Sequence, residues 1–207
     1  MQYVVCLAFG YLIGSFPTAY LLVKWRRRID IREAGSGSVG AMNTFDVSGS
    51  KMLSTAVLVI DLMKGVFAVW LCSVTVDREF WVMGSGGLGA IAGHNYSPWL
   101  KFKGGRGLAT ALGVILSMGW IFVVVWCVPW IIVYSISKDI HLSNITASII
   151  GPVILVASPE HLWQMTLPSF SDSTNFRYLM IFICMLLVLR HHNYIVEIRE
   201  SLTNTKP

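Results

Sequence analysis

Long runs of apolar residues, separated by short polar segments, dominate the pattern of this 207-residue chain. A helix needs about 20 apolar residues to cross a bilayer, and several of the runs are shorter than that. The pattern predicts an all-α membrane protein, built as a helical bundle with several short helices. The apolar runs lie at 2–23, 54–76, 80–99, 108–137, 143–157 and 175–189.

The composition favours the same class of protein. Hydrophobic residues make up 55% of the chain and charged residues only 13%, with a mean hydropathy of +0.63. Soluble domains carry roughly a quarter charged residues. The length allows one compact bundle, so we expect a single integral membrane domain over residues 1–207. The cysteines have neither metal-ligand spacing nor a disulfide framework, so we expect them to pack among apolar residues. They are Cys6, Cys72, Cys127 and Cys184.

Basic residues gather in two short polar segments, at 24–32 and at 101–106. Short cationic loops mark the cytoplasmic side of a membrane, so the N-terminus is expected outside. The net charge of +5 is explained in part by this orientation and by contact with anionic lipid headgroups. Because the chain has no extended soluble basic surface, we expect no nucleic-acid partner.

The apolar run at 108–137 is too long for one untilted span. A break near Ser117–Gly119 would give two shorter helices and return Lys138 and the C-terminal tail to the cytoplasm. The chain would then form about seven transmembrane helices, with the N-terminus outside and the C-terminus cytoplasmic. The segment 158–174 is expected to be an external connection with a short surface helix.

Two glycine-rich segments are the main candidates for a binding site. Exposed backbone N–H groups beside hydroxyls or cations suit an oxyanion such as phosphate. The first segment also fits a plain flexible connection between helices. In the second segment the cations fit a membrane anchor, but that role leaves its three glycines unexplained. The candidate residues are Gly35, Ser36, Gly37, Ser38, Gly40 and Asn43 in the first segment, and Lys101, Lys103, Gly104, Gly105, Arg106, Gly107 and Thr110 in the second.

Ionisable residues inside or beside apolar runs form a second group of candidates. Asp61 and Lys64 lie three apart and so share a helix face, where a structural ion pair is favoured over direct substrate contact. His191, His192 and Asn193 follow the last apolar run. An interfacial histidine is often a hydrogen-bonded residue with a structural role only, but this cluster could also orient a substrate or relay its proton.

Several motifs appear in a specific order along nearly the whole chain. They are Gly14-Ser15-Phe16-Pro17, the stretch Asp30–Asn43, Asp61-Leu62-Met63-Lys64-Gly65, Gly93-His94-Asn95-Tyr96 and the stretch Lys101–Thr110. In this order they resemble the motifs of the bacterial acyl-phosphate:glycerol-3-phosphate acyltransferase family. The resemblance has departures: the family has Asn where Ser38 stands, Thr where Met42 stands, Arg where Asp46 stands and Lys where Arg106 stands.

The resemblance implies a monomeric enzyme of the bacterial inner membrane with its active site on the cytoplasmic face. It would transfer a fatty acyl group from acyl phosphate to the 1-hydroxyl of glycerol 3-phosphate, giving lysophosphatidic acid in the first step of phospholipid synthesis. Neither a metal nor a cofactor is expected. The first glycine segment would hold the acyl-phosphate head and the second the acceptor phosphate, while Ser36, His191 and Asn193 would act at the reacting centre.

Three alternatives remain open at this stage. The departures at Met42 and Asp46 are compatible with a paralogue that uses another polyol phosphate, or with a member that binds lipid phosphates without turnover. A small transporter would place Asp61 and Lys64 along its pathway. Transporters often show inverted repeats around a midplane site, however, and this sequence shows no repeat.

Overall fold

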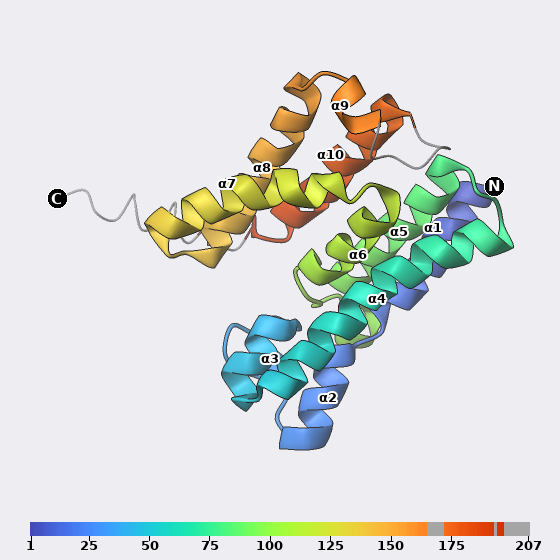
Figure 1. Cartoon of the computed structure of the whole chain (residues 1–207). Helices are drawn as coiled ribbons and strands as arrows, with labels where there is room; N and C mark the ends of the chain where they lie inside the picture. The colour runs from blue at the N-terminus through green and yellow to red at the C-terminus, as the bar shows by residue number, and fades with distance from the viewer. Residues whose placement is uncertain (165–171, 193, 197–207) are drawn as a thin grey trace.

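The computed structural model describes residues 1–164, 172–192 and 194–196, and within these ranges it contains helices and no strand (Figure 1). Two 3₁₀ turns, at Ile31–Glu33 and Pro98–Leu100, interrupt the connecting loops. The α-helices are α1 (Gln2–Ser15), α2 (Thr18–Arg27), α3 (Ala41–Ser48), α4 (Lys51–Thr75), α5 (Phe80–Asn95), α6 (Leu108–Met118), α7 (Ile121–Ser137), α8 (Ile140–Ala157), α9 (His161–Gln164) and α10 (Ser173–Leu189).

Three stretches are long and apolar enough to cross a membrane: Gln2–Arg27, Lys51–Thr75 and Ile140–Ala157. The helices α6, α7 and α10 are apolar but shorter. The predicted break in the run 108–137 is confirmed, because α6 ends at Met118 and α7 begins at Ile121. The expected surface helix in 158–174 is α9, and residues 165–171 lie outside the described part of the chain.

The apolar run 2–23 is divided between two helices, α1 and α2. The chain leaves the helix at Phe16, whose ψ is 122°, and α2 starts after Pro17. Proline lacks an N–H group and disfavours helical geometry in the residue before it, so an apolar Phe-Pro pair ends α1 without any polar signal. The short helix α3 was also not predicted, because it lies inside the glycine-rich connection.

Glycines bring α1 and α5 into backbone contact. A Cβ atom on Gly89 would overlap the carbonyl oxygen of Leu7, and one on Gly93 would overlap that of Tyr11. Helices that approach this closely gain dispersion contacts along their whole length, which is the usual basis of helix association in a bilayer. The pair α4 and α6 approaches in the same way at Gly65 and Gly113.

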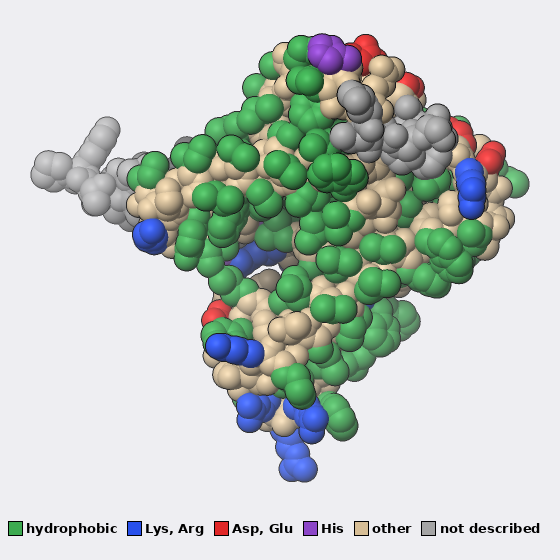
Figure 2. Space-filling model, in the orientation of Figure 1, with side chains coloured by type: hydrophobic (Ala, Val, Ile, Leu, Met, Phe, Trp, Pro, Cys, Tyr) green, Lys and Arg blue, Asp and Glu red, His purple; other side chains and the backbone are tan. Residues whose placement is uncertain are grey.

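The helices form two groups with a hollow between them. Figure 1 shows α4 running diagonally beside α1, α5 and α6, with α2 and α3 at one end of this first group. The second group contains α7 and α8, which lie above the first group in this view. Helix α10 contacts α5, α6 and α8 and therefore joins the groups. Figure 2 shows basic side chains gathered at the α2 and α3 end, next to the hollow.

A buried ion pair fixes α4 to the break between α1 and α2. Asp61 is 2% exposed and Lys64 7% exposed, and Lys64 Nζ lies 2.7 Å from Asp61 Oδ1. Lys64 Nζ also donates to the carbonyl oxygen of Phe16 over 2.5 Å. The lysine thus adds a second hydrogen bond, beside that of the Thr18 amide, to a carbonyl that the proline break leaves outside a regular helix.

Replacing Gly89 by alanine should separate α1 from α5 and lower the free energy of unfolding by about 1–3 kcal/mol, since the new methyl group overlaps backbone that cannot move aside. Gly84→Ala on the same helix is the matched control, because a Cβ there meets side chains at ordinary contact distance, Leu179 at 3.4 Å and Trp81 at 3.8 Å. Thermal unfolding in detergent measures both. Equal melting temperatures for the two variants would show that the close backbone packing of α1 and α5 does not determine the stability of the protein.

Replacing Asp61 by asparagine should leave the Lys64 charge buried and unpaired, and lower the free energy of unfolding by about 3–5 kcal/mol. Asp46→Asn, a change of the same kind at an exposed position, should stay within about 0.5 kcal/mol. The double variant Asp61→Asn, Lys64→Met should recover much of the loss. Denaturant titration in micelles tests this, and an Asp61→Asn protein as stable as Asp46→Asn would contradict it.

Candidate active site

The first glycine-rich segment is folded around the side chain of Asn43, which is only 2% exposed. Its Oδ1 accepts a hydrogen bond from the Ser36 amide over 2.9 Å, and its Nδ2 donates to the carbonyl oxygens of Ile31, Ala34 and Ser38. Gly35 and Gly37 adopt positive φ angles of 60° and 68°, which favour glycine. The Asn43 side chain is therefore engaged in holding the loop in shape.

Two helices begin side by side at a common cavity, which we call the polar cavity. Gly40 precedes α3 and Gly107 precedes α6, and neither helix has a side-chain cap. Uncapped amides at a helix start, together with the helix dipole, attract anions. The polar cavity has a volume of about 240 Å³ and is lined by residues of both helix starts and by Ser36, Ser38, Asp61, His94, Arg106 and Asn144.

The second glycine-rich segment packs its glycine pair against the end of α5. The amides of Gly104 and Gly105 donate to the carbonyl oxygens of Asn95 and His94, over 3.2 and 3.1 Å. Arg190 then donates to the carbonyl oxygens of the same glycines, each over 2.9 Å. The expectation that these two amides are available to a phosphate is therefore wrong. Both glycines are needed because a Cβ at either position would overlap His94.

The three cations of this segment have different surroundings. Arg106 lines the polar cavity, whereas Lys101 and Lys103 are exposed and are not among its lining residues. Thr110 is fully buried, and its hydroxyl oxygen has no partner among the described residues. Of the three predicted cationic ligands, Arg106 alone is placed to touch an anion inside the cavity.

Arg106 belongs to a cluster with two histidines. A guanidinium can only donate, so Arg106 Nη1 donates to His141 Nδ1 over 3.0 Å, and that nitrogen carries no proton. The His141 ring lies 5.9 Å from the His191 ring and 5.0 Å from the Tyr194 ring. Burial, together with the nearby charge of Arg190, lowers the pKa of Arg106 from its ordinary value.

The two histidines after α10 differ in burial, and neither is among the residues that line the two cavities of this site. His191 is 3% exposed, and its Nδ1 donates to the Leu187 carbonyl oxygen over 2.8 Å, while Nε2 has no partner among the described residues. Burial lowers the pKa of His191, and the neighbouring Arg106 lowers it further, so the ring is neutral near pH 7 with Nε2 as an acceptor. His192 is exposed, and Asn193 lies outside the described residues.

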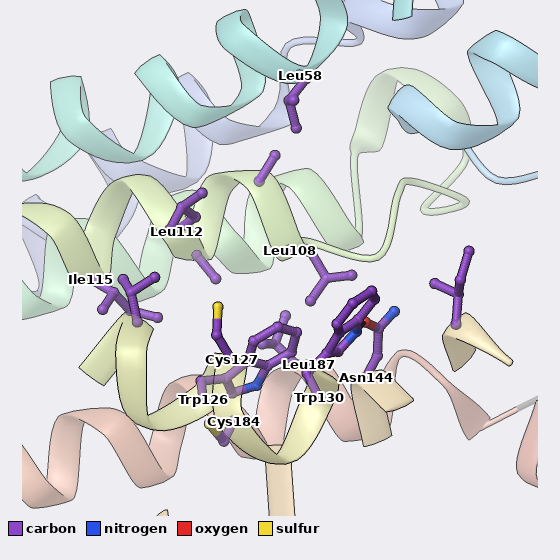
Figure 3. Close-up of a pocket in the computed structure, with 14 residues that line it drawn as sticks. Leu58, Leu108, Leu112, Ile115, Trp126, Cys127, Trp130, Asn144, Cys184 and Leu187 are labelled. Atoms are coloured by element: carbon purple, nitrogen blue, oxygen red, sulfur yellow. Dashed lines mark hydrogen bonds between the residues drawn. The ribbon is translucent and has the colours of Figure 1, made fainter. Parts of the chain in front are cut away.

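A second cavity, which we call the apolar cavity, adjoins the polar one (Figure 3). Its volume is about 360 Å³, and it is enclosed by side chains of α4, α6, α7, α8 and α10. Trp126 and Trp130 of α7 form much of one wall, opposite Leu108 and Leu112 of α6. The two cavities share several lining residues, which are Leu58, Leu108, Ala109, Ile140 and Asn144.

Several functional candidates were missed from the sequence. Asn144 lies in the apolar run 143–157 and His141 lies just before it, neither in a motif, and their position becomes clear only when α8 packs beside α7. Arg190 is a further residue of this kind, because it donates hydrogen bonds to the carbonyl oxygens of Gly104 and Gly105. Asp46, which replaces a cation in the family motif, is exposed on α3 and does not line the polar cavity.

Known proteins that are similar in sequence share one family description. Residues 4–201 match the family model described as glycerol-3-phosphate acyltransferase. A glycerol-3-phosphate acyltransferase of Gloeobacter violaceus is 35% identical over 164 residues, covering 78% of this chain and 77% of the relative. A protein of the same name from Mesorhizobium japonicum is 37% identical over 153 residues, covering 73% of this chain and 76% of the relative.

Two solved structures are similar over nearly the whole chain. Both are of PlsY (YgiH), an integral membrane glycerol 3-phosphate acyltransferase. The glycerol 3-phosphate form is 27% identical with a TM-score of 0.77, covering 97% of this chain and 94% of the other. The lysophosphatidic acid form is 26% identical with a TM-score of 0.76, covering 97% and 93%. The chain therefore belongs to the glycerol-3-phosphate acyltransferase family.

Proposed function

We propose that this protein transfers a fatty acyl group from acyl phosphate to the 1-hydroxyl of glycerol 3-phosphate and releases lysophosphatidic acid. The observation that carries the proposal is the pair of adjoining cavities. One is polar and faces two helix starts, Arg106 and His94, while the other is apolar and extends between helices. Phosphate groups suit the first and a fatty chain suits the second. The activity named for the relatives and for the PlsY structures supports the same reaction.

The chemistry requires positioning more than a strong nucleophile, because the acyl phosphate is already activated. The acceptor oxygen forms a bond to the acyl carbon, and the bond from that carbon to the bridging phosphate oxygen breaks. The hydroxyl proton ends on the released phosphate. A covalent acyl–Ser36 intermediate is not needed, since no hydrogen bond joins the Ser36 side chain to a base among the described residues.

The residues divide between the two phosphates. The hydroxyls of Ser36 and Ser38 and the amides at the start of α3 would hold the acyl-phosphate head. Arg106 and the amides from Gly107 onward would hold the acceptor phosphate, with the buried Thr110 supporting the first turn of α6. Lys101 and Lys103, exposed on the same loop, would raise the local positive potential and attract anionic substrates.

The orientation in the membrane follows from the basic end of the molecule. Since cationic loops remain cytoplasmic, both glycine-rich segments would face the cytoplasm, with the N-terminus outside and the C-terminus inside. In this arrangement the soluble acceptor enters from the cytoplasm, while the fatty chain enters the apolar cavity from the bilayer. One chain holds all the residues named above, so a monomer would suffice.

The direct test incubates the purified protein in micelles with acyl phosphate and a panel of polyol phosphates. Phosphate release should depend on glycerol 3-phosphate and should match the lysophosphatidic acid formed, followed by malachite green and mass spectrometry. No release with any acceptor would defeat the enzyme proposal. Release with a different polyol phosphate alone would reassign the acceptor and leave acyl transfer in place.

Arg106→Gln should lower kcat/KM for glycerol 3-phosphate by about 10²-fold, the loss expected when one charged hydrogen bond to a phosphate is removed. Lys103→Gln is the matched control from the same loop, and its loss should be no more than a few-fold because the side chain is exposed. Steady-state kinetics with varied acceptor separates the two. Equal losses would mean that the loop acts only through its overall charge.

A further inference from the structure

Asn144 occupies the boundary between the two cavities. It lies on α8, is 3% exposed, and lines both the polar and the apolar cavity. The other residues that line both cavities, Leu58, Leu108, Ala109 and Ile140, have apolar side chains. A polar amide is therefore buried at the point where a lipid-like substrate would change from headgroup to chain.

The orientation of the Asn144 amide is fixed by Trp130. The indole Nε1 donates to Asn144 Oδ1 over 2.8 Å, and because an indole N–H can only donate, its partner must be the amide oxygen. The Nδ2 group then lies on the side away from the indole (Figure 3), and no described residue accepts a hydrogen bond from it. The Trp130 ring is itself held by stacking on Tyr134, with 4.9 Å between ring centroids.

An acyl phosphate has its carbonyl group between its phosphate and its fatty chain. If the phosphate occupies the polar cavity and the chain the apolar cavity, the carbonyl must lie at the boundary between them. Because the Asn144 amide already points in one direction, it could meet a developing negative charge there without reorganisation.

We propose that Asn144 is a catalytic residue whose Nδ2 group donates a hydrogen bond to the acyl carbonyl oxygen. This inference rests on the proposed function. When the acceptor oxygen adds to the carbonyl carbon, the electron pair of the C=O bond moves onto the oxygen and Asn144 stabilises that oxyanion. The pair returns as the bond to the phosphate oxygen breaks, so Asn144 neither gains nor loses a proton. Trp130 is the corresponding positioning residue.

Two substitutions distinguish the proposed donor, the Asn144 Nδ2 group, from the hydrogen bond that Asn144 Oδ1 accepts from Trp130. Asn144→Asp keeps an oxygen acceptor for Trp130 but removes the N–H donor, and Asn144→Leu removes both without adding charge. Each should lower kcat by about 10²–10³-fold, the loss typical of one oxyanion donor. Ser148→Ala is the matched control: Ser148 accepts from Trp126 Nε1 over 3.1 Å one turn further along α8, yet it lines neither cavity.

Binding is measured with hexadecyl phosphate, which has a chain and a phosphate but no carbonyl, as a competitive inhibitor. Its inhibition constant should change by no more than about two-fold in Asn144→Leu, because the lost contact exists only with a carbonyl. Ser148→Ala should retain wild-type kcat. This set of results would support the proposal.

Other results would overturn it. Wild-type kcat in Asn144→Asp would show that only the bond to Trp130 matters. Equal losses of kcat and hexadecyl phosphate affinity in Asn144→Leu would indicate a structural role. An inactive wild-type protein would instead defeat the proposed function, and the inference with it, whereas failure of the Asn144 proposal alone leaves the wild-type protein active.

Discussion

The contact between Lys64 and the Phe16 carbonyl oxygen holds the active-site end of the molecule together. Pro17 separates α1 from α2 and leaves the Phe16 carbonyl oxygen outside a regular helix. Lys64 donates to that carbonyl oxygen, and Asp61 neutralises the lysine and lies 3.8 Å from His94 Nδ1. One pair of charges thus connects the first apolar run, α4 and the end of α5. The polar cavity can form because these three parts are fixed relative to one another.

The two glycine-rich segments are both shaped by a long polar side chain that reaches the backbone. The buried Asn43 side chain donates hydrogen bonds to backbone carbonyl oxygens of the first segment. Arg190 donates to the carbonyl oxygens of Gly104 and Gly105 in the second segment. Among the described residues, the amides at the starts of α3 and α6 have no side-chain cap and remain open. Under the proposed function, the anion sites are therefore built before the substrate arrives, and binding does not have to order the loops.

How far the sequence predicted this molecule depends on whether the signal was local. The break at Gly119 was predictable because the run 108–137 exceeds one span, whereas the break at Pro17 interrupts a run that looks continuous. The pattern of glycines and cations pointed to Ser36 and Arg106, and both line the polar cavity. It could not reveal that the Gly104 and Gly105 amides donate hydrogen bonds to carbonyl oxygens at the end of α5. Nor could it reveal Asn144, since its role depends on how α7 and α8 pack.

The charge balance in the polar cavity bears on where the reaction's proton goes. Two phosphate groups would bring about −1.5 to −2 charges each near neutral pH. Arg106 contributes one positive charge and each helix start about +0.5, while Asp61 and Lys64 cancel. The occupied cavity would therefore carry excess negative charge, which Lys101 and Lys103 offset only from the surface. Loss of the acceptor's proton to bulk water would add one more negative charge to that excess, so under the proposed function the proton belongs on the departing phosphate.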